Sequence, residues 1–131
     1  MQENQTPPQA EIFHIIGGYW LSRAVYLAAR LKLADAVGDR PTSLASIAAV
    51  TGAKLENLRR LMRALAGHGF FRDEGNETFG QTPLSETLRS DRSGSMRAFA
   101  EAELGHDHYD SWRNVEGCLR DRCRDRIAAD E

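Results

Sequence analysis

The chain has 131 residues, of which 41% are hydrophobic and 27% charged, and its formal net charge is −2 at pH 7. This length suits one domain, and the composition excludes both a disordered chain and a membrane-embedded protein. The slight negative charge gives no overall attraction to phosphate groups, so nucleic-acid binding would require a local basic patch. The N-terminus lacks the basic and apolar segments of a secretory signal, and we expect a cytoplasmic protein.

The first predicted element is a helix over residues 10–31, preceded by a flexible arm over residues 1–9. Arg23 and Arg30 fall on one strip about 100° wide, and most of the remaining circumference is apolar. Residues 12–29 carry one formal charge and could span a membrane, but Arg23 near their middle and the polar remainder of the chain argue against that alternative. Because a monomer with so wide an apolar face would aggregate, we predict that this helix packs both on its own domain and on a second copy of the chain.

A helix-turn-helix is predicted next. A short helix ends at Gly38, and the following helix begins with an N-cap at Thr42 or Ser43 and ends at Gly52. Residues 55–69 then repeat apolar side chains at helical spacing. Two helices joined by a tight Thr-Gly turn are typical of a helix-turn-helix. The side chains expected to be buried are those of Leu44, Ile47, Ala48, Val50, Leu55, Leu58, Leu61, Met62, Leu65 and Ala66.

The segment after these helices predicts a β-hairpin of the kind called a wing, with its turn at Gly75 and Asn76. A short helix follows, with Thr82 as its N-cap and Pro83 at its first position. The predicted fold is therefore mainly α with a small β-hairpin: a winged helix-turn-helix with an N-terminal dimerisation helix and C-terminal helices.

The C-terminal part, residues 95–120, suggests two helices separated near Gly105, and residues 121–131 form a charged tail that we expect to be solvated. We place one winged-helix domain over residues 10–120. Cys118 and Cys123 are spaced as neither a CxxC redox pair nor a zinc knuckle, so we expect two free thiols.

The helix over residues 55–69 raises the question of DNA binding. Arg60 and Arg63 lie opposite its apolar stripe, as base-reading side chains would. The alternative is that Arg60 forms a surface ion pair with Glu56. The predicted wing favours the alternative, because it carries three carboxylates and only one arginine. The carboxylates would repel a phosphate backbone. The three carboxylates are those of Asp73, Glu74 and Glu77.

Other chemistry is weakly indicated. The segment GHDHYD at residues 105–110 holds possible metal ligands, but its spacing does not suit a helical metal site, and surface histidines are the commoner interpretation. GxSxG, P-loop and GxGxxG motifs do not occur in the sequence, so we identify no catalytic residue. The recurring aromatic residues are explained either by core and dimer packing or by a pocket for a flat apolar ligand. They are Phe13, Tyr19, Trp20, Tyr26, Phe99, Tyr109 and Trp112.

Three motifs together resemble a known family. They are LAARLKLADAV at 27–37, SLASIAAVTGAKLENLRRLMRALAGHGFF at 43–71 and FGQTPLSETL at 79–88, followed by Trp112. The set is similar to the N-terminal dimerisation domain of S-adenosylmethionine-dependent O-methyltransferases of the small-molecule type, such as the hydroxyneurosporene and polyketide methyltransferases. The resemblance covers about residues 10–120.

The resemblance implies that the winged helix serves dimerisation in a transferase of secondary metabolism. Residues Phe13, Ile16, Tyr19 and Trp20 would then lie in the homodimer interface and border the partner's substrate pocket. Residues Phe99, Leu104, Tyr109 and Trp112 would line the pocket of the same chain for a small aromatic or polyketide-like acceptor.

One departure from the family pattern affects the expected activity. Family members continue with a glycine-rich Rossmann-like domain that binds S-adenosylmethionine (SAM) and carries the catalytic histidine, whereas this chain has CLRDRCRDRIAADE at 118–131. We therefore expect a dimerisation and substrate-lining domain that is inactive alone, with no cofactor, metal or catalytic residue of its own. The alternative is a stand-alone winged-helix transcriptional regulator that contacts DNA through Arg60 and Arg63.

Overall fold

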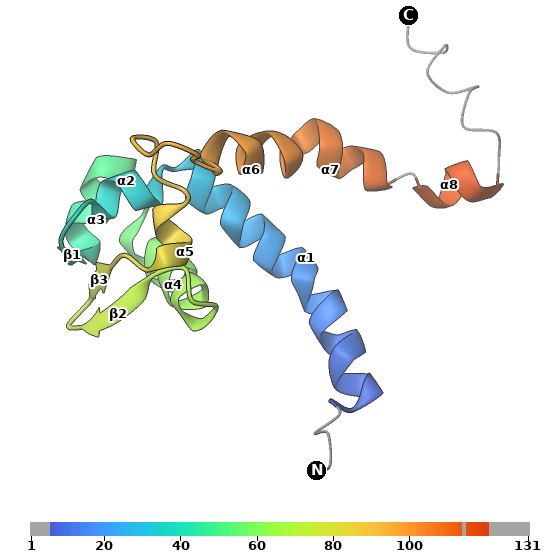
Figure 1. Ribbon diagram of the computed structural model, residues 1–131, viewed down its shortest axis with the longest axis horizontal. Coiled ribbons are helices and arrows are strands. Elements are labelled where there is room, and N and C mark those ends of the chain that lie inside the picture. Colours follow the sequence, from blue (N-terminus) through green and yellow to red (C-terminus); the bar gives the residue numbers. More distant parts are fainter. Residues whose placement is uncertain (1–5, 114, 121–131) are drawn as a thin grey trace, which may run out of the picture.

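The computed structural model describes residues 6–113 and 115–120. Its first element, α1, spans Pro8–Arg30 and begins where Pro7 and Pro8 favour a helix start. Only the C-terminal part of α1 is buried, at Tyr26, Ala28 and Ala29. The rest extends away from the body of the protein as a single continuous helix (Figure 1).

The body is built around the predicted helix-turn-helix. It consists of α2 (Leu33–Val37), α3 (Leu44–Thr51) and α4 (Leu55–Gly67). Of the two possible caps for α3, Ser43 is the one used, because its side chain accepts a hydrogen bond from the backbone N–H of Ser46. Gly52 ends α3 in the left-handed conformation that glycine adopts without strain.

The core lies where α2, α3 and α4 meet the end of α1. Of the predicted apolar stripe of α4, Leu58, Met62 and Leu65 are buried there, whereas Leu61 and Ala66 are half-buried. Leu55 on α4 and Val50 on α3 are exposed, contrary to the sequence prediction. The fully buried large side chains are Leu33, Leu44, Ile47, Leu58, Met62, Leu65 and Phe71.

The wing has one more strand than predicted. β2 (Arg72–Gly75) and β3 (Thr78–Gly80) form the expected hairpin, and β3 also pairs with the two-residue strand β1 (Thr42–Ser43), giving the order β1-β3-β2. The turn is one residue later than predicted, at Asn76 and Glu77, which both have positive φ. A strand of two residues has too short a pattern to be found in the sequence.

After the wing, α5 (Pro83–Glu86) begins with the predicted cap at Thr82, and Thr82 and Ser85 form a reciprocal capping box. The C-terminal helices are α6 (Arg97–Glu103), α7 (His106–Arg113) and α8 (Val115–Arg120). The break near Gly105 confirms the predicted separation of α6 from α7. Together they form a second extension, which diverges from α1 (Figure 1).

Cys118, on α8, corrects one expectation from the sequence, because it is disulfide-bonded rather than a free thiol. The spacing argument excluded metal and redox motifs, but a disulfide needs only two Cα atoms about 4.4–6.8 Å apart and no set sequence spacing. Cys123 and the predicted tail lie outside the described residues.

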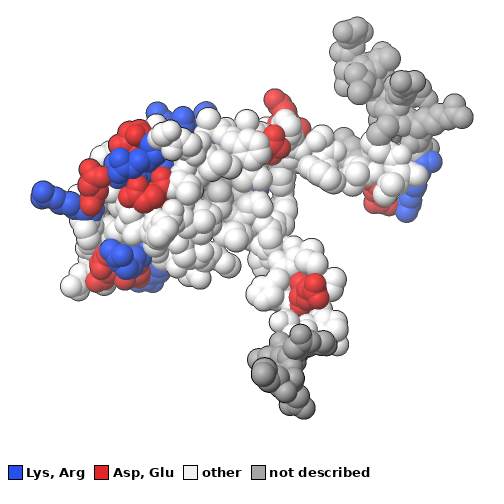
Figure 2. Space-filling model, in the orientation of Figure 1, with Lys and Arg blue, Asp and Glu red and all other residues white. Residues whose placement is uncertain are grey.

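The charged side chains are unevenly distributed over the surface. In Figure 2 lysine, arginine, aspartate and glutamate side chains cover much of the body and also occur on the extension formed by α6 to α8, whereas most of the surface of α1 is uncharged. Across residues 6–113 and 115–120, none of the helices combines the length and the apolar character needed to cross a membrane. The uncharged part of α1 therefore stands on an otherwise polar molecule, which makes it the first candidate for a functional surface.

Candidate functional site

The exposed part of α1 carries a nearly continuous apolar surface. Its large side chains are more than half exposed: Ile12, Phe13, Ile15, Ile16, Tyr19 and Trp20. All four residues that the sequence places in a dimer interface belong to this set, which we call the α1 surface. At about 25 cal/mol per Å² of buried apolar area, covering several such side chains is worth several kcal/mol.

Two glycines lie within the α1 surface. A Cβ atom built on Gly17 or Gly18 would meet nothing within 4 Å in this chain, and α1 runs through both positions without a break. Neither glycine is required by internal packing or by an unusual backbone conformation. The absence of side chains leaves room for another backbone to approach α1 closely at this point.

The residues predicted to line an acceptor pocket lie on α6 and α7. Phe99 and Trp112 are exposed, whereas Leu104 and Tyr109 are half-buried. Tyr109 and Trp112 meet Tyr19 of α1 and Arg113 around an open cavity of about 330 Å³. Phe99 and Leu104 do not line this cavity, so the structure brings together only two of the four residues in the predicted set.

Tyr19, which was predicted to lie in the dimer interface, contacts Tyr109, which was predicted to line the acceptor pocket. Its ring centroid lies 5.7 Å from that of Tyr109, with the planes tilted by 37°. A hydrogen bond with Tyr19 raises the pKa of the Tyr109 phenol above its usual value, and partial desolvation adds to this shift. The α1 surface and the cavity lined by Tyr109 and Trp112 are therefore adjacent parts of one surface.

The polar strip of α1, which carries Arg23 and Arg30, faces α6 and α7 of the same chain. The sequence did not predict this contact. Arg23 donates a hydrogen bond to the carbonyl oxygen of Leu104 at 2.7 Å. Arg30 lies two turns further along α1 and bonds Glu101 at 2.8 Å. Glu101 also accepts a hydrogen bond from Arg97, and the guanidinium of Arg30 is the main cause of the lowered pKa of the Glu101 carboxyl.

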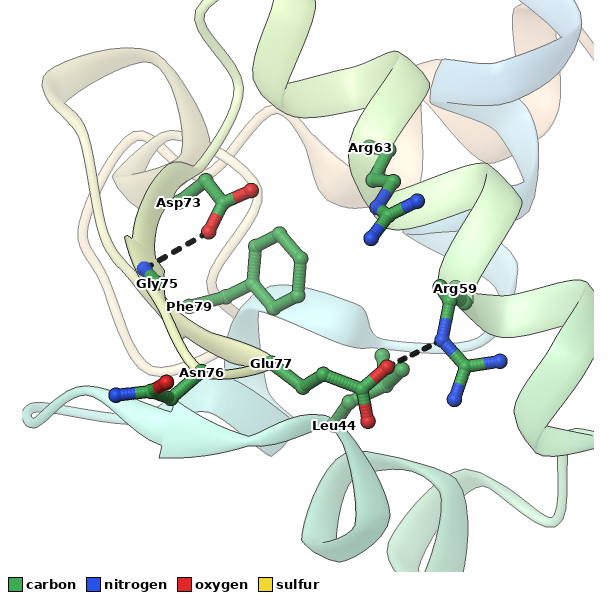
Figure 3. Close-up of a pocket in the computed structure, with 8 residues that line it drawn as sticks. All are labelled: Leu44, Arg59, Arg63, Asp73, Gly75, Asn76, Glu77 and Phe79. Atoms are coloured by element: carbon green, nitrogen blue, oxygen red, sulfur yellow. Dashed lines mark hydrogen bonds and ion pairs between the residues drawn. The ribbon is translucent and has the colours of Figure 1, made fainter.

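A small cavity of about 180 Å³ lies between α4, the helix that raised the question of DNA binding, and the wing (Figure 3). Arg59 crosses it and forms ion pairs with Glu77 of the wing turn and with Glu56 on α4. Arg59 is the first cause of the lowered pKa of Glu77. Asp73 also lines the cavity and accepts a hydrogen bond from the backbone N–H of Gly75. Arg63 lines the cavity too, whereas Arg60 does not, so two carboxylates stand beside two arginines there. Such a cavity offers a phosphate no excess of positive charge, which does not suit nucleic-acid binding.

The ion pair predicted on α4 involves a different arginine. Glu56 bonds Arg59 at 2.6 Å, three residues along the helix, instead of Arg60. Both spacings place side chains on neighbouring positions of a helix, so the sequence alone does not choose between them. In the structure Arg59 pairs with both Glu56 and Glu77, so it joins α4 to the wing turn.

The two histidines of the segment at residues 105–110 each contact a side chain outside that segment. The ring of His106 packs edge-on against Tyr26 with the centroids 6.2 Å apart, and Nδ1 of His108 lies 3.6 Å from Glu103. Within the part of the chain that the structure describes, no three side chains of His, Cys, Asp or Glu converge as metal ligands would.

A buried arginine network was missed by the sequence interpretation. The Arg89 side chain is only 6% exposed and bonds Asp39 at 2.6 Å and Asp91 at 3.0 Å. Arg92 lies beside it and reaches Asp39 and Glu86. The alternation of charges in residues 86–92 is the only signal of this network in the sequence, because Asp39 is distant along the chain. The network joins the loop after α2 to the segment after α5.

Comparison with known proteins gives consistent matches. The family model described as the O-methyltransferase dimerisation domain matches residues 13–91. The chain is 38% identical over 109 residues to the phenazine O-methyltransferase PhzM of Lysobacter antibioticus, a match that covers 83% of this chain and 32% of that protein.

Two solved structures are similar to the whole described fold. LaPhzM has a TM-score of 0.82 and 36% identity, over 88% of this chain and 34% of that chain. The N,N-8-amino-8-demethyl-D-riboflavin dimethyltransferase RosA from Streptomyces davawensis has a TM-score of 0.81 and 27% identity, over the same shares. The chain spans about a third of the length of these relatives.

Proposed function

Because the chain belongs to the family of O-methyltransferase dimerisation domains, we propose that it forms a homodimer through the α1 surface and lines the acceptor pocket of a SAM-dependent methyltransferase. The observation that carries this proposal is the α1 surface itself. Its aromatic and aliphatic side chains are exposed in the single chain, while the charges of the molecule gather elsewhere. A second copy would cover the α1 surface and supply the same surface in return, as a two-fold interface requires.

The proposed acceptor wall consists of Tyr19, Tyr109 and Trp112. Three aromatic rings around an open cavity suit a flat, largely apolar ligand, which can stack on their faces. By their names, the similar proteins described above act on a phenazine and on an aminoriboflavin compound. Both compounds contain fused aromatic rings. We propose an acceptor of the same kind, a small aromatic or polyketide-like molecule, for the protein to which this domain belongs.

The methyl donor has no fitting site among the described residues. Dinucleotide and nucleoside sites of the Rossmann type need a parallel strand, a glycine-rich turn and a helix. The three strands here are antiparallel and two to four residues long. We therefore propose that SAM and the catalytic base belong to a part of the enzyme other than residues 6–113 and 115–120, and no step of catalysis is assigned to them.

Size-exclusion chromatography with light scattering tests the homodimer. The expected mass is twice the 14.6 kDa of one chain at micromolar concentration. A mass of 14.6 kDa that stays constant as the concentration rises through the micromolar range would overturn the proposal. Titration of the unaltered chain with phenazine by isothermal titration calorimetry tests the acceptor wall separately, and the absence of any heat of binding would remove that part.

A further inference from the structure

Arg23 occupies the junction between α1 and the corner that joins α6 to α7. Its guanidinium carbon lies 4.5 Å from the ring centroid of Tyr26 and 4.6 Å from that of Tyr109. The same guanidinium donates its hydrogen bond to the carbonyl oxygen of Leu104, the C-cap of α6. One side chain of α1 therefore contacts a tyrosine of its own helix, a tyrosine of α7 and the backbone between α6 and α7.

The position of α7 depends on very few contacts. None of its residues is buried, so burial in the core does not fix its direction. Its described contacts with α1 are the ring pairs Tyr19–Tyr109 and Tyr26–His106 and the stacking of Arg23 on Tyr109. Arg30 holds α6 through Glu101, but Glu101 lies before the corner and does not reach α7.

The corner itself has no room for a side chain at Gly105. A Cβ atom at Gly105 would lie 2.8 Å from the carbonyl oxygen of Glu101, so the backbone passes close to the end of α6. The Leu104 carbonyl directly before this glycine is the one that Arg23 binds. A planar guanidinium can donate in its plane while both of its faces stack on rings, which a lysine ammonium cannot do.

We propose that Arg23 is a positioning residue that holds α7 against α1 and thereby sets the separation of Tyr19 and Tyr109 in the acceptor wall. The role in ligand binding rests on the function proposed above, whereas the role in placing α7 does not. Arg23 does not line the cavity, so it acts on a bound ligand only through the two tyrosines.

The first test follows the tyrosine rings by NMR, using ring-labelled tyrosine in the full chain. The chain has three tyrosines, which single Tyr→Phe changes would assign. In Arg23→Gln the contacts between the ring protons of Tyr19 and Tyr109 are expected to weaken or disappear, although neither of these rings is altered. Arg23→Lys should restore them in part, and the matched control Arg30→Gln should leave them unchanged.

The titration of Tyr109 distinguishes positioning from a purely electrostatic role. The hydrogen bond with Tyr19 is the main cause of the raised pKa of Tyr109, and the charge of Arg23 lowers it. If Arg23 positions α7, Arg23→Gln separates the two phenols, and the pKa of Tyr109 falls toward its usual value of about 10. If Arg23 acts only through its charge, the same variant raises this pKa. A rise, or ring contacts that persist in Arg23→Gln, would overturn the proposal.

The second test measures phenazine affinity by isothermal titration calorimetry, with the unaltered chain as the parent. Arg23→Gln is expected to weaken binding about threefold or more, the scale of one lost cation–π contact, while Arg30→Gln binds as the parent does. Equal affinity in Arg23→Gln and the parent would overturn the positioning role in the pocket. If the parent itself does not bind phenazine while the ring contacts still depend on Arg23, the acceptor wall fails and the placement of α7 stands.

Discussion

Arg89 shows how a single side chain can connect distant segments of this fold. Its buried guanidinium forms ion pairs with the carboxylates of Asp39 and Asp91, and these two carboxylates are themselves largely exposed. Hydrogen bonds from Arg89 are the first cause of the lowered pKa of both carboxyl groups. The network therefore contributes to stability only while these groups are ionised.

The predicted consequence is a loss of stability in acid. Because the folded-state pKa values of Asp39 and Asp91 lie below the ordinary value of about 3.9, their contribution is complete above that pH and is lost as the pH falls through the lowered values. Urea unfolding at pH 7 and pH 3 should show Arg89→Met destabilised relative to the wild type at pH 7, with a smaller difference at pH 3.

Arg60→Met is the matched control for this measurement, because Arg60 is exposed and forms none of the ion pairs described above. Its stability should follow that of the wild type at both pH values. A difference between Arg89→Met and the wild type that is equally large at pH 3 and pH 7 would contradict the linkage to Asp39 and Asp91.

At the residue scale, the sequence predicted local pairs better than distant ones. A Glu–Arg pair on α4 could be expected from helical spacing, although the partner proved to be Arg59. The contacts of Arg23 with Tyr109 and of Arg89 with Asp39 could not be predicted, because they depend on how separate elements pack. The same holds for Tyr19 and Tyr109, which the family resemblance placed in two different sets.

At the scale of elements, α3 shows where a periodic pattern is misleading. Leu44 and Ile47 are fully buried, whereas Val50 is 73% exposed. At about 100° per residue, Val50 lies roughly 120° around the helix from Leu44, beyond the face that meets α2 and α4. The sequence correctly predicted an apolar helix with a cap and a glycine stop, but a helix of eight residues, little more than two turns, has too few residues to define the width of its buried face.

A matched pair of substitutions on α3 tests this assignment. Ile47→Ala should lower the free energy of unfolding by about 2–5 kcal/mol, because it removes fully buried methyl and methylene groups and leaves a cavity. Val50→Ala should change it by less than about 0.5 kcal/mol. Chemical denaturation at pH 7 provides both values, and equal losses in the two variants would show that α3 packs through a different face.

The capping box of α5 supports a second prediction at this scale. The Thr82 side chain accepts a hydrogen bond from the backbone N–H of Ser85 and donates one to the carbonyl oxygen of Gly69. Thr82→Ala should cost about 1 kcal/mol of stability. Thr82→Ser keeps the hydroxyl group that makes both hydrogen bonds, so it should recover most of the lost stability in the same denaturation experiment. If the serine variant is as unstable as the alanine variant, the cap is not the source of the effect.

At the scale of the whole molecule, the fold divides into a body that buries a core and two extensions that bury little. The winged-helix body was predictable because caps, glycine stops and helical spacing agree along residues 33–88. The directions of the two extensions were not, because they depend on polar contacts between distant residues: Arg30 with Glu101 joins α1 to α6, and Arg23 with Leu104 joins α1 to the corner that leads into α7. The body suits the role of a scaffold that presents the apolar α1 surface to a second chain.

Sedimentation equilibrium of two matched variants tests the assignment of the dimer interface most directly. Ile16 on the α1 surface and Val50 on α3 are both exposed aliphatic side chains, 59% and 73%. Placing a glutamate in a self-complementary interface leaves buried charges facing each other, so Ile16→Glu should raise the dimer dissociation constant by at least about 100-fold. Wild type and Val50→Glu should remain dimers under the same conditions. A dimer of Ile16→Glu as tight as that of the wild type would contradict the assignment of the interface to α1.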